Sequence, residues 1–121
     1  MRYREVGIEV EMIIALQVSG HLNAYAYDNI VVDGTVKTLA AGKIENTADF
    51  KDLGKAKLIR ISVEEQTMRF REDNLADPSL TEGHLLSPGD WYYIANLQQM
   101  KNFKFTRATG TSGRIFVTYF R

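Results

Sequence analysis

The sequence predicts an all-β protein: an antiparallel β-sandwich, jelly-roll or immunoglobulin-like, of about eight short strands in a single domain over residues 1–121. Three observations lead to this prediction. Short runs alternate between apolar and polar residues, turn signals separate the runs at intervals of about 8–12 residues, and no segment has the length and periodicity of a substantial helix. A chain of 121 residues is one domain of ordinary size, which buries roughly two-thirds of the surface that the unfolded chain exposes.

The first expected strand covers residues 8–18. Apolar side chains stand at every second position from Ile8 to Val18, and polar residues hold several of the alternate positions. This period of two is typical of a strand with one buried face. A helix stays open as the alternative, because Ile13 and Ala15 interrupt the alternation.

Residues 29–39 contain the next expected strands. Two runs rich in β-branched residues, 30–32 and 35–39, flank the dipeptide Asp33-Gly34. Asp-Gly between such runs is a strong local signal for a hairpin. We therefore expect the two runs to pair directly with each other.

The middle of the chain changes character twice. Residues 40–55 are small and polar, and we expect one short helical turn over 48–53, capped by Asn46 or Thr47. Residues 57–63 and 68–70 then alternate again on either side of a polar corner. We expect these two runs to form an antiparallel pair.

The rest of the chain repeats the pattern of short runs and turns. A polar excursion over residues 72–82 precedes a short run, a Pro-Gly turn and an aromatic strand. A single helical turn is expected over 96–102, and a glycine-containing hairpin loop is expected to reverse the chain before the last strand. The expected strands here are 84–86, 91–94, 103–106 and 115–120.

Composition argues against several functional classes. Lys and Arg number 15, as do Asp and Glu, so the formal charge is zero and there is no overall basic field to attract nucleic acid or an anionic membrane. The absence of cysteine removes disulfides, thiolate metal sites and a cysteine nucleophile. No apolar run approaches the roughly 18 residues of a membrane span, so we expect a soluble chain without a cleaved leader.

Residues that carry catalysis are not apparent in the sequence. The two histidines, His21 and His84, are far apart and fit no metal-binding spacing. A nucleophile elbow and a phosphate-binding loop are both absent from the sequence. The carboxylates between residues 72 and 90 are more typical of a solvated loop, and the basic residues of the second half are interspersed with acidic ones that favour ion pairs. We expect no enzyme activity, no metal and no cofactor.

Aromatic residues are the main anomaly. Residues 115–120 are large on both faces of one expected strand, as are residues 91–93. Either such a strand is central and covered on both sides, or one of its faces meets another subunit. Tyrosine and tryptophan are enriched at protein interfaces. The predicted interface residues are Trp91, Tyr92, Tyr93, Phe116 and Tyr119.

A series of short motifs in the second half keeps a fixed order: Arg69-Phe70-Arg71, Asp77-Pro78-Ser79, Gly83 with Leu86, Gly89-Asp90, Asn96-Leu97, Phe103-Lys104-Phe105, Gly110-Thr111-Ser112 and Val117-Thr118-Tyr119-Phe120. In this order the half-chain resembles small β-sandwich structural proteins of tailed bacteriophages that belong to the head and tail region. Two departures are Asp73-Asn74 in place of the usual Asp-Gly, and Ser79 in place of threonine after the proline.

The resemblance implies a non-enzymatic component of the virion, made in the cytoplasm of the host bacterium. Such a subunit decorates or cements the capsid, or sits at the head–tail connection or in the tail. Its expected partners are copies of itself and other virion proteins, such as the major capsid protein or head–tail proteins, with no nucleic acid and no membrane. Residues 1–55 match only in general layout, so the resemblance does not assign their partner surface.

A carbohydrate-binding module for adhesion to the host surface is the alternative. The loop after residue 72 also resembles a turn of immunoglobulin-like accessory domains in chitin-degrading enzymes, although such a turn says more about fold than about ligand. In this alternative, aromatic rings stack on sugar faces beside Asn74, Asp77 and His84.

Overall fold

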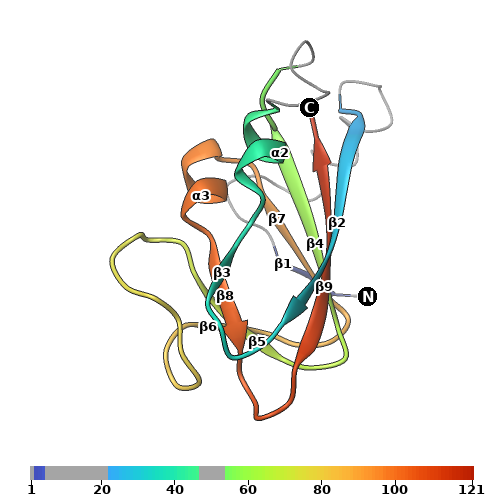
Figure 1. Cartoon of the computed structure of the whole chain (residues 1–121). Coiled ribbons are helices and arrows are strands. Elements are labelled where there is room, and N and C mark those ends of the chain that lie inside the picture. Colours follow the sequence, from blue (N-terminus) through green and yellow to red (C-terminus); the bar gives the residue numbers. More distant parts are fainter. Residues whose placement is uncertain (1, 5–21, 47–53) are drawn as a thin grey trace.

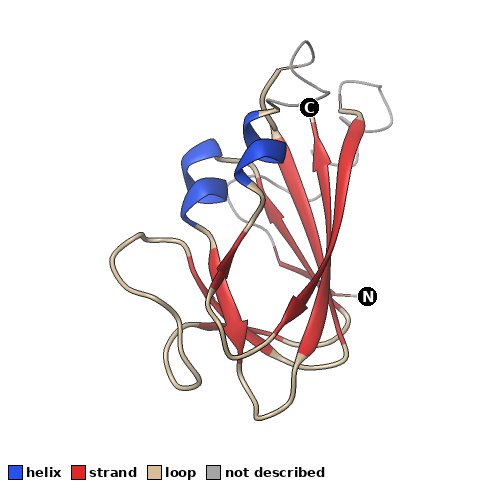
Figure 2. Ribbon diagram, viewed as in Figure 1, coloured by secondary structure: helices blue, strands red, loops and turns tan. Residues whose placement is uncertain are grey.

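The strands form two sheets that pack face to face (Figures 1 and 2). The computed structural model describes residues 2–4, 22–46 and 54–121. Within these residues the strands are β1 (Arg2–Arg4), β2 (Ala24–Val32), β3 (Lys37–Thr38), β4 (Leu58–Glu64), β5 (Met68–Arg71), β6 (His84–Leu86), β7 (Asp90–Ile94), β8 (Lys104–Arg107) and β9 (Gly113–Phe120). The short helices are α2 (Ala41–Glu45) and α3 (Leu97–Asn102).

The order of the strands is that of a jelly roll. One sheet has the order β1-β7-β4-β9-β2 and the other has the order β3-β8-β5-β6. All neighbouring strands are antiparallel except β1, which runs parallel to β7 at the edge. From β2 to β9 the chain changes sheet at every connection except the one between β5 and β6. This arrangement confirms the expected sandwich and decides for the jelly roll over the immunoglobulin-like alternative.

The core lies between the two sheets. Alternate residues of β4 and β9 point inward, among them Ile61 and Tyr119, both with 0% of their surface exposed. The other sheet contributes Phe70 and Phe105, and Phe103 joins them from the connection between α3 and β8. Each such side chain stabilises the fold by about 1.5–3 kcal/mol when it is fully buried. The alternation of apolar and polar residues in the sequence therefore reflects the burial of one face of each strand between the two sheets.

Three expected hairpins are wrong, because each is a crossing between sheets. The runs that flank Asp33-Gly34 become β2 and β3, which lie in different sheets. The same is true of β4 with β5 and of β8 with β9. At the first crossing, Gly34 lacks the positive φ of a type I′ hairpin turn, and the Asp33 side chain instead accepts a hydrogen bond from the Thr35 N–H (2.9 Å).

The two helices confirm one expectation and correct another. Asn96 caps α3, because its side chain accepts a hydrogen bond from the Gln99 N–H (3.0 Å). Asn46 ends α2, a helix that the sequence did not predict, as its C-cap with a φ of 61°. The expected turn over 48–53 and the expected strand over 8–18 fall outside the described residues. No helix in the described residues is long and apolar enough to cross a membrane.

The long loop between β5 and β6, residues 72–83, folds back over the outer side of the four-stranded sheet. Arg69 on β5 donates hydrogen bonds to the carbonyl oxygens of Leu80 (2.9 Å) and Gly83 (2.8 Å), and Lys104 on β8 pairs with Asp77 (3.1 Å). Asn74 has a φ of 59°, the left-handed conformation that asparagine tolerates. The loop thus covers the outer side of the four-stranded sheet and does not reach the outer side of the five-stranded sheet.

Candidate functional site

The outer side of the five-stranded sheet carries the most unusual surface of the described residues. We call it the outer aromatic face. It consists of Tyr27 on β2, Arg60 on β4, Trp91 and Tyr93 on β7, and Phe116 and Phe120 on β9. Because alternate residues of a strand point to opposite sides, each of these side chains is one position away from a residue that lies in the core or packs against it.

Strand register arranges the face in rows. Trp91 pairs with Ser62, which in turn pairs with Phe116. In the next row, Arg60 stands between Tyr93 and Thr118. Paired residues of antiparallel strands lie on the same side of a sheet, so the rings and the guanidinium group come within reach of one another.

Arg60 lies between two rings. Its guanidinium carbon is 5.2 Å from the centre of the Trp91 ring and 5.1 Å from that of Phe120. Contacts of this kind stabilise by about 0.5–1 kcal/mol at exposed sites. They also hold a cationic group in a fixed place in the middle of an apolar surface.

Tyr27 and Phe116 form the exposed part of the face. Their rings are nearly parallel, with an angle of 17° and centres 6.2 Å apart. Tyr27 keeps 54% of its surface exposed, and Phe116 is half-buried beside it. Sequence reasoning missed Tyr27, although Tyr25 and Tyr27 alternate with alanine in the segment that forms β2.

The structure separates the five predicted interface residues. Trp91 and Phe116 lie half-buried on the outer aromatic face. Tyr93 lies on the same side but is 5% exposed, in a small cluster with Leu22, Leu58 and Phe120. Tyr92 and Tyr119 point to the other side of the sheet.

Tyr92 and Tyr119 must be corrected as interface residues. They are 5% and 0% exposed, and both belong to the core between the sheets. The Tyr92 ring centre is 4.7 Å from that of Phe70. Adjacent residues of a strand cannot share a face, so Tyr92 could not join Trp91 in one contact surface.

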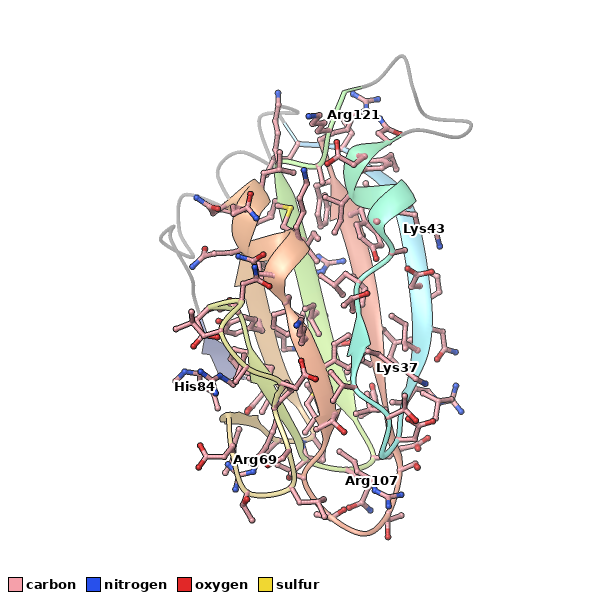
Figure 3. The ribbon with its side chains drawn as sticks, turned by 60° about the vertical axis from the view of Figure 1, so that its left-hand side comes forward. Lys37, Lys43, Arg69, His84, Arg107 and Arg121 are labelled. Atoms are coloured by element: carbon pink, nitrogen blue, oxygen red, sulfur yellow. The ribbon has the colours of Figure 1, made fainter. Side chains whose placement is uncertain are left out.

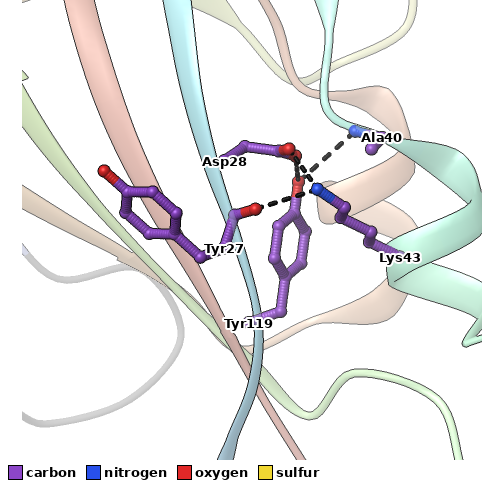
Figure 4. A network of polar contacts seen from close by, with 5 residues as sticks. All are labelled: Tyr27, Asp28, Ala40, Lys43 and Tyr119. Carbon is purple, nitrogen blue, oxygen red and sulfur yellow. Dashed lines mark hydrogen bonds and ion pairs between the residues drawn. The ribbon is translucent and has the colours of Figure 1, made fainter. Parts of the chain in front are cut away.

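A polar network anchors α2 to the edge of the face (Figure 4). The Tyr119 hydroxyl donates to the Asp28 carboxylate (2.8 Å) and accepts from the Ala40 N–H (3.4 Å). The Lys43 ammonium pairs with Asp28 and donates to the Tyr27 carbonyl oxygen (2.8 Å). Burial, and then the hydrogen bond to Asp28, raise the pKa of Tyr119 far above its usual value. The Tyr119 hydroxyl therefore stays protonated, and the network serves to hold α2 against strands β2 and β9.

Glu72 is a second polar centre, on the far side of β7 from the outer aromatic face. The Tyr92 hydroxyl donates to Glu72 Oε1 (3.0 Å), and Glu72 Oε2 is buried without a hydrogen-bond partner in the described residues. Burial raises the pKa of Glu72, while the hydrogen bond from Tyr92 and the proximity of His84 lower it in part. Within the described residues, no group of three or more metal-ligating side chains is present.

We expect Glu72→Gln to stabilise the protein at about pH 8 and to have less effect at about pH 4. The folded state raises the pKa of Glu72, so protonation of this group favours folding, and the contribution is lost as the pH rises through the folded-state value. Glutamine stays uncharged and keeps an oxygen that accepts from Tyr92. Urea midpoints of both proteins at the two pH values measure the effect, with exposed Glu82→Gln as the control. An equal difference at both pH values would contradict the assignment.

The polar residues that were expected to bind sugar do not lie beside the aromatic rings of the outer aromatic face. Asn74 and Asp77 belong to the loop over the four-stranded sheet, and His84 lies on β6 of that sheet (Figure 3). Trp91 and Phe116 lie on the outer side of the opposite sheet. The two parts of the predicted sugar site therefore stand on opposite sides of the sandwich.

Comparison of the chain with family models, with curated proteins and with solved structures gives no match.

Proposed function

We propose that this chain is a non-enzymatic structural protein of a tailed-bacteriophage virion. In this proposal it is a capsid decoration or cement subunit, or a head–tail accessory subunit, that associates with copies of itself and binds other virion proteins. The outer aromatic face is the observation that carries the proposal. Trp, Tyr and Arg dominate the binding energy of protein interfaces, and this face combines Trp91, Tyr27 and Arg60 on one sheet.

The fold and the motifs support the proposal by analogy. Jelly rolls are common in viral capsid domains, although lectins and cupins use them as well. Fold alone does not fix function, so the weight rests on the surface. The ordered motifs of residues 69–120, which resemble phage head and tail proteins, favour the viral use over the others.

The edge of the sheet favours association through its face. Lys43 and Lys37 donate to the carbonyl oxygens of Tyr27 (2.8 Å) and Val31 (2.6 Å) on the edge strand β2. Lysines placed along an edge strand obstruct pairing with a strand of another chain. A partner is therefore expected to approach the side chains of the outer aromatic face and not to extend the sheet.

Light scattering over a range of concentrations tests self-association. We expect an oligomer in the unmodified protein, and at least a tenfold weaker association in Trp91→Ala and in Tyr27→Ala, because truncation of a central interface aromatic costs about 2 kcal/mol or more. Leu85→Ala is the matched control, since Leu85 is 44% exposed on β6 in the other sheet. Circular dichroism verifies that each variant is folded.

Two outcomes would contradict the proposed self-association. A protein that stays monomeric at every concentration would contradict self-association. So would a tenfold loss of association in Leu85→Ala that equals the loss in Tyr27→Ala. Binding to purified phage heads and tails, measured with the same variants, tests the virion partner separately. Unchanged binding in both Trp91→Ala and Tyr27→Ala would exclude the outer aromatic face as that contact.

Glycan binding is the second candidate, and one observation favours it. Tyr27 keeps 54% of its surface exposed and its ring lies nearly parallel to that of Phe116. A ring that stacks on a sugar must be accessible in this way. A glycan array distinguishes the two functions, because saccharide binding that is lost in Tyr27→Ala would support adhesion to the host surface. If no glycan on the array binds, the result would favour the structural role over adhesion.

A further inference from the structure

A pocket opens on the side of the sandwich opposite the outer aromatic face. It has a volume of about 400 Å³ and lies between the β2–β3 connection, the loop over the four-stranded sheet and β8. The pocket lies toward the lower end of the sandwich in the view of Figure 3, where Arg69 and Arg107 are labelled. The residues that define its chemistry are Gly34, Val36, Ser79, Leu80, Thr81 and Arg107.

Arg107 enters the pocket without an acceptor for its buried N–H. Its Nε is buried and has no hydrogen-bond partner in the part of the chain that the structure describes. The guanidinium lies close against Gly34, where a Cβ would come within 3.3 Å of Nη2. Arg69 and Arg71, by contrast, bind loop carbonyls and Asp73. A buried donor without a partner is unfavourable, and no side-chain hydrogen bond or ion pair within the described residues occupies the remaining N–H groups of Arg107.

The hydroxyl groups of the pocket add a further donor. Ser79 Oγ accepts from the N–H groups of Thr81 (3.2 Å) and Glu82 (3.1 Å). The Ser79 and Thr81 hydroxyls are 3.4 Å apart, so whichever of them donates to the other, one hydroxyl hydrogen remains for a ligand. The pocket therefore offers a cation and a hydroxyl donor to one acceptor group.

No ion pair joins Arg107 to a carboxylate among the described residues, and two carboxylates of the segments around the pocket have other partners. Asp33 accepts from the Thr35 N–H (2.9 Å) and faces Lys37 (3.5 Å). Asp77 pairs with Lys104 (3.1 Å). Within the described residues the positive charge of Arg107 therefore has no carboxylate partner.

We propose that this pocket binds the carboxylate of an Asp or Glu side chain from a partner protein. The Arg107 guanidinium holds the carboxylate, since its planar N–H groups fit that geometry, and the Ser79–Thr81 pair donates a further hydrogen bond. Val36 and Leu80 supply apolar walls for the methylene stem. None of the described residues that line the pocket is aromatic, so a platform for a sugar ring is missing there and a protein side chain is the better fit. The site is independent of the outer aromatic face and would serve a second neighbour.

Amide chemical shifts of ¹⁵N-labelled protein test the site with N-acetylglutamate methylamide as the probe and N-acetylglutamine methylamide as its neutral match. We expect saturable shifts at Gly34, Thr81 and Arg107 with the charged probe, and affinity at least about tenfold lower in Arg107→Gln. Arg114→Gln on β9 removes the same charge from the other sheet and should bind as the unmodified protein does. Thr81→Val keeps the shape of the side chain and should weaken binding severalfold, which keeps the test open even if Arg107→Gln fails to fold.

Several outcomes would overturn the proposal. These are the absence of saturable shifts, equal shifts with the glutamine probe, and an equal loss in Arg114→Gln. A response to glucuronate without a response to the glutamate probe would assign the pocket to an acidic saccharide instead. None of these outcomes affects the outer aromatic face, so failure here is distinguishable from failure of the proposed function.

Discussion

Replacement of Phe103 by alanine should lower the free energy of unfolding by about 3–5 kcal/mol. Phe103 is 0% exposed, and its ring centre lies 5.1 Å from that of Phe70, 5.9 Å from that of Tyr92 and 5.8 Å from that of Phe105. These rings come from both sheets. A truncated side chain would leave a cavity that its stiff neighbours cannot fill, which is why the cost exceeds that of burial alone.

Urea unfolding measures this loss, and Phe116→Ala is its matched control. Phe116 is the same residue type on the other side of the five-stranded sheet, half-buried against Tyr27, so its truncation should cost only about 1 kcal/mol. A loss as large as that of Phe103→Ala would mean that Phe116 belongs to the core. The outer aromatic face would then not be available to a partner, and the proposed function would lose its basis.

Strand positions were predictable from the sequence, but the pairing of strands was not. Alternation in residues 57–63 reflects one face against the core, and the aromatic strand over 91–94 and the helical turn over 96–102 follow equally local rules. At Asp33-Gly34 the sequence marks a change of direction only. Whether the chain then returns in the same sheet or crosses to the other depends on distant partners, here β9 for β2 and β8 for β3.

The candidate site was predictable in part for the same reason. Period two implies that Trp91 and Tyr93 share one side and Tyr92 the other, yet both sides of β7 and β9 are aromatic, so the sequence does not say which side is inner. That choice follows from packing, because Tyr119 reaches Asp28 within the sandwich. The sequence presented Arg60 only as one of several basic residues that favour ion pairs, since its contact with rings from β7 and β9 depends on how the strands pair.

The pocket at Arg107 illustrates a further limit of the sequence. Gly34 and Arg107 are far apart in the chain, and the residues between them give no sign that they meet. The jelly-roll crossing brings the connection after β2 against the end of β8, where the Arg107 N–H donates to the Asp33 carbonyl oxygen (3.0 Å). A binding site at such a junction depends on how the strands are connected and paired, so short sequence motifs do not predict it.

The second large effect should come from Asp28. Asp28→Ala should lower the free energy of unfolding by about 2–3 kcal/mol, because it leaves the buried Tyr119 hydroxyl without its acceptor and Lys43 without its carboxylate. Tyr119→Phe removes the hydroxyl itself and should cost only about 1 kcal/mol. The larger cost thus falls on the variant that leaves the fully buried hydroxyl without an acceptor, because Tyr119→Phe deprives only the half-buried Ala40 N–H of its long, 3.4 Å contact.

A double-mutant cycle separates the two contributions. In the Tyr119→Phe background, Asp28→Ala no longer strands a hydroxyl, so its cost should fall by about 1 kcal/mol or more below its cost in the unmodified protein. Lys43→Met is the control for the remaining part, since it removes the charge from α2 and keeps an apolar stem. Urea unfolding of the four cycle members at neutral pH gives the coupling energy. Strict additivity would contradict the network, and it would indicate that α2 is held by the burial of Ile44 and not by the contacts among Asp28, Lys43 and Tyr119.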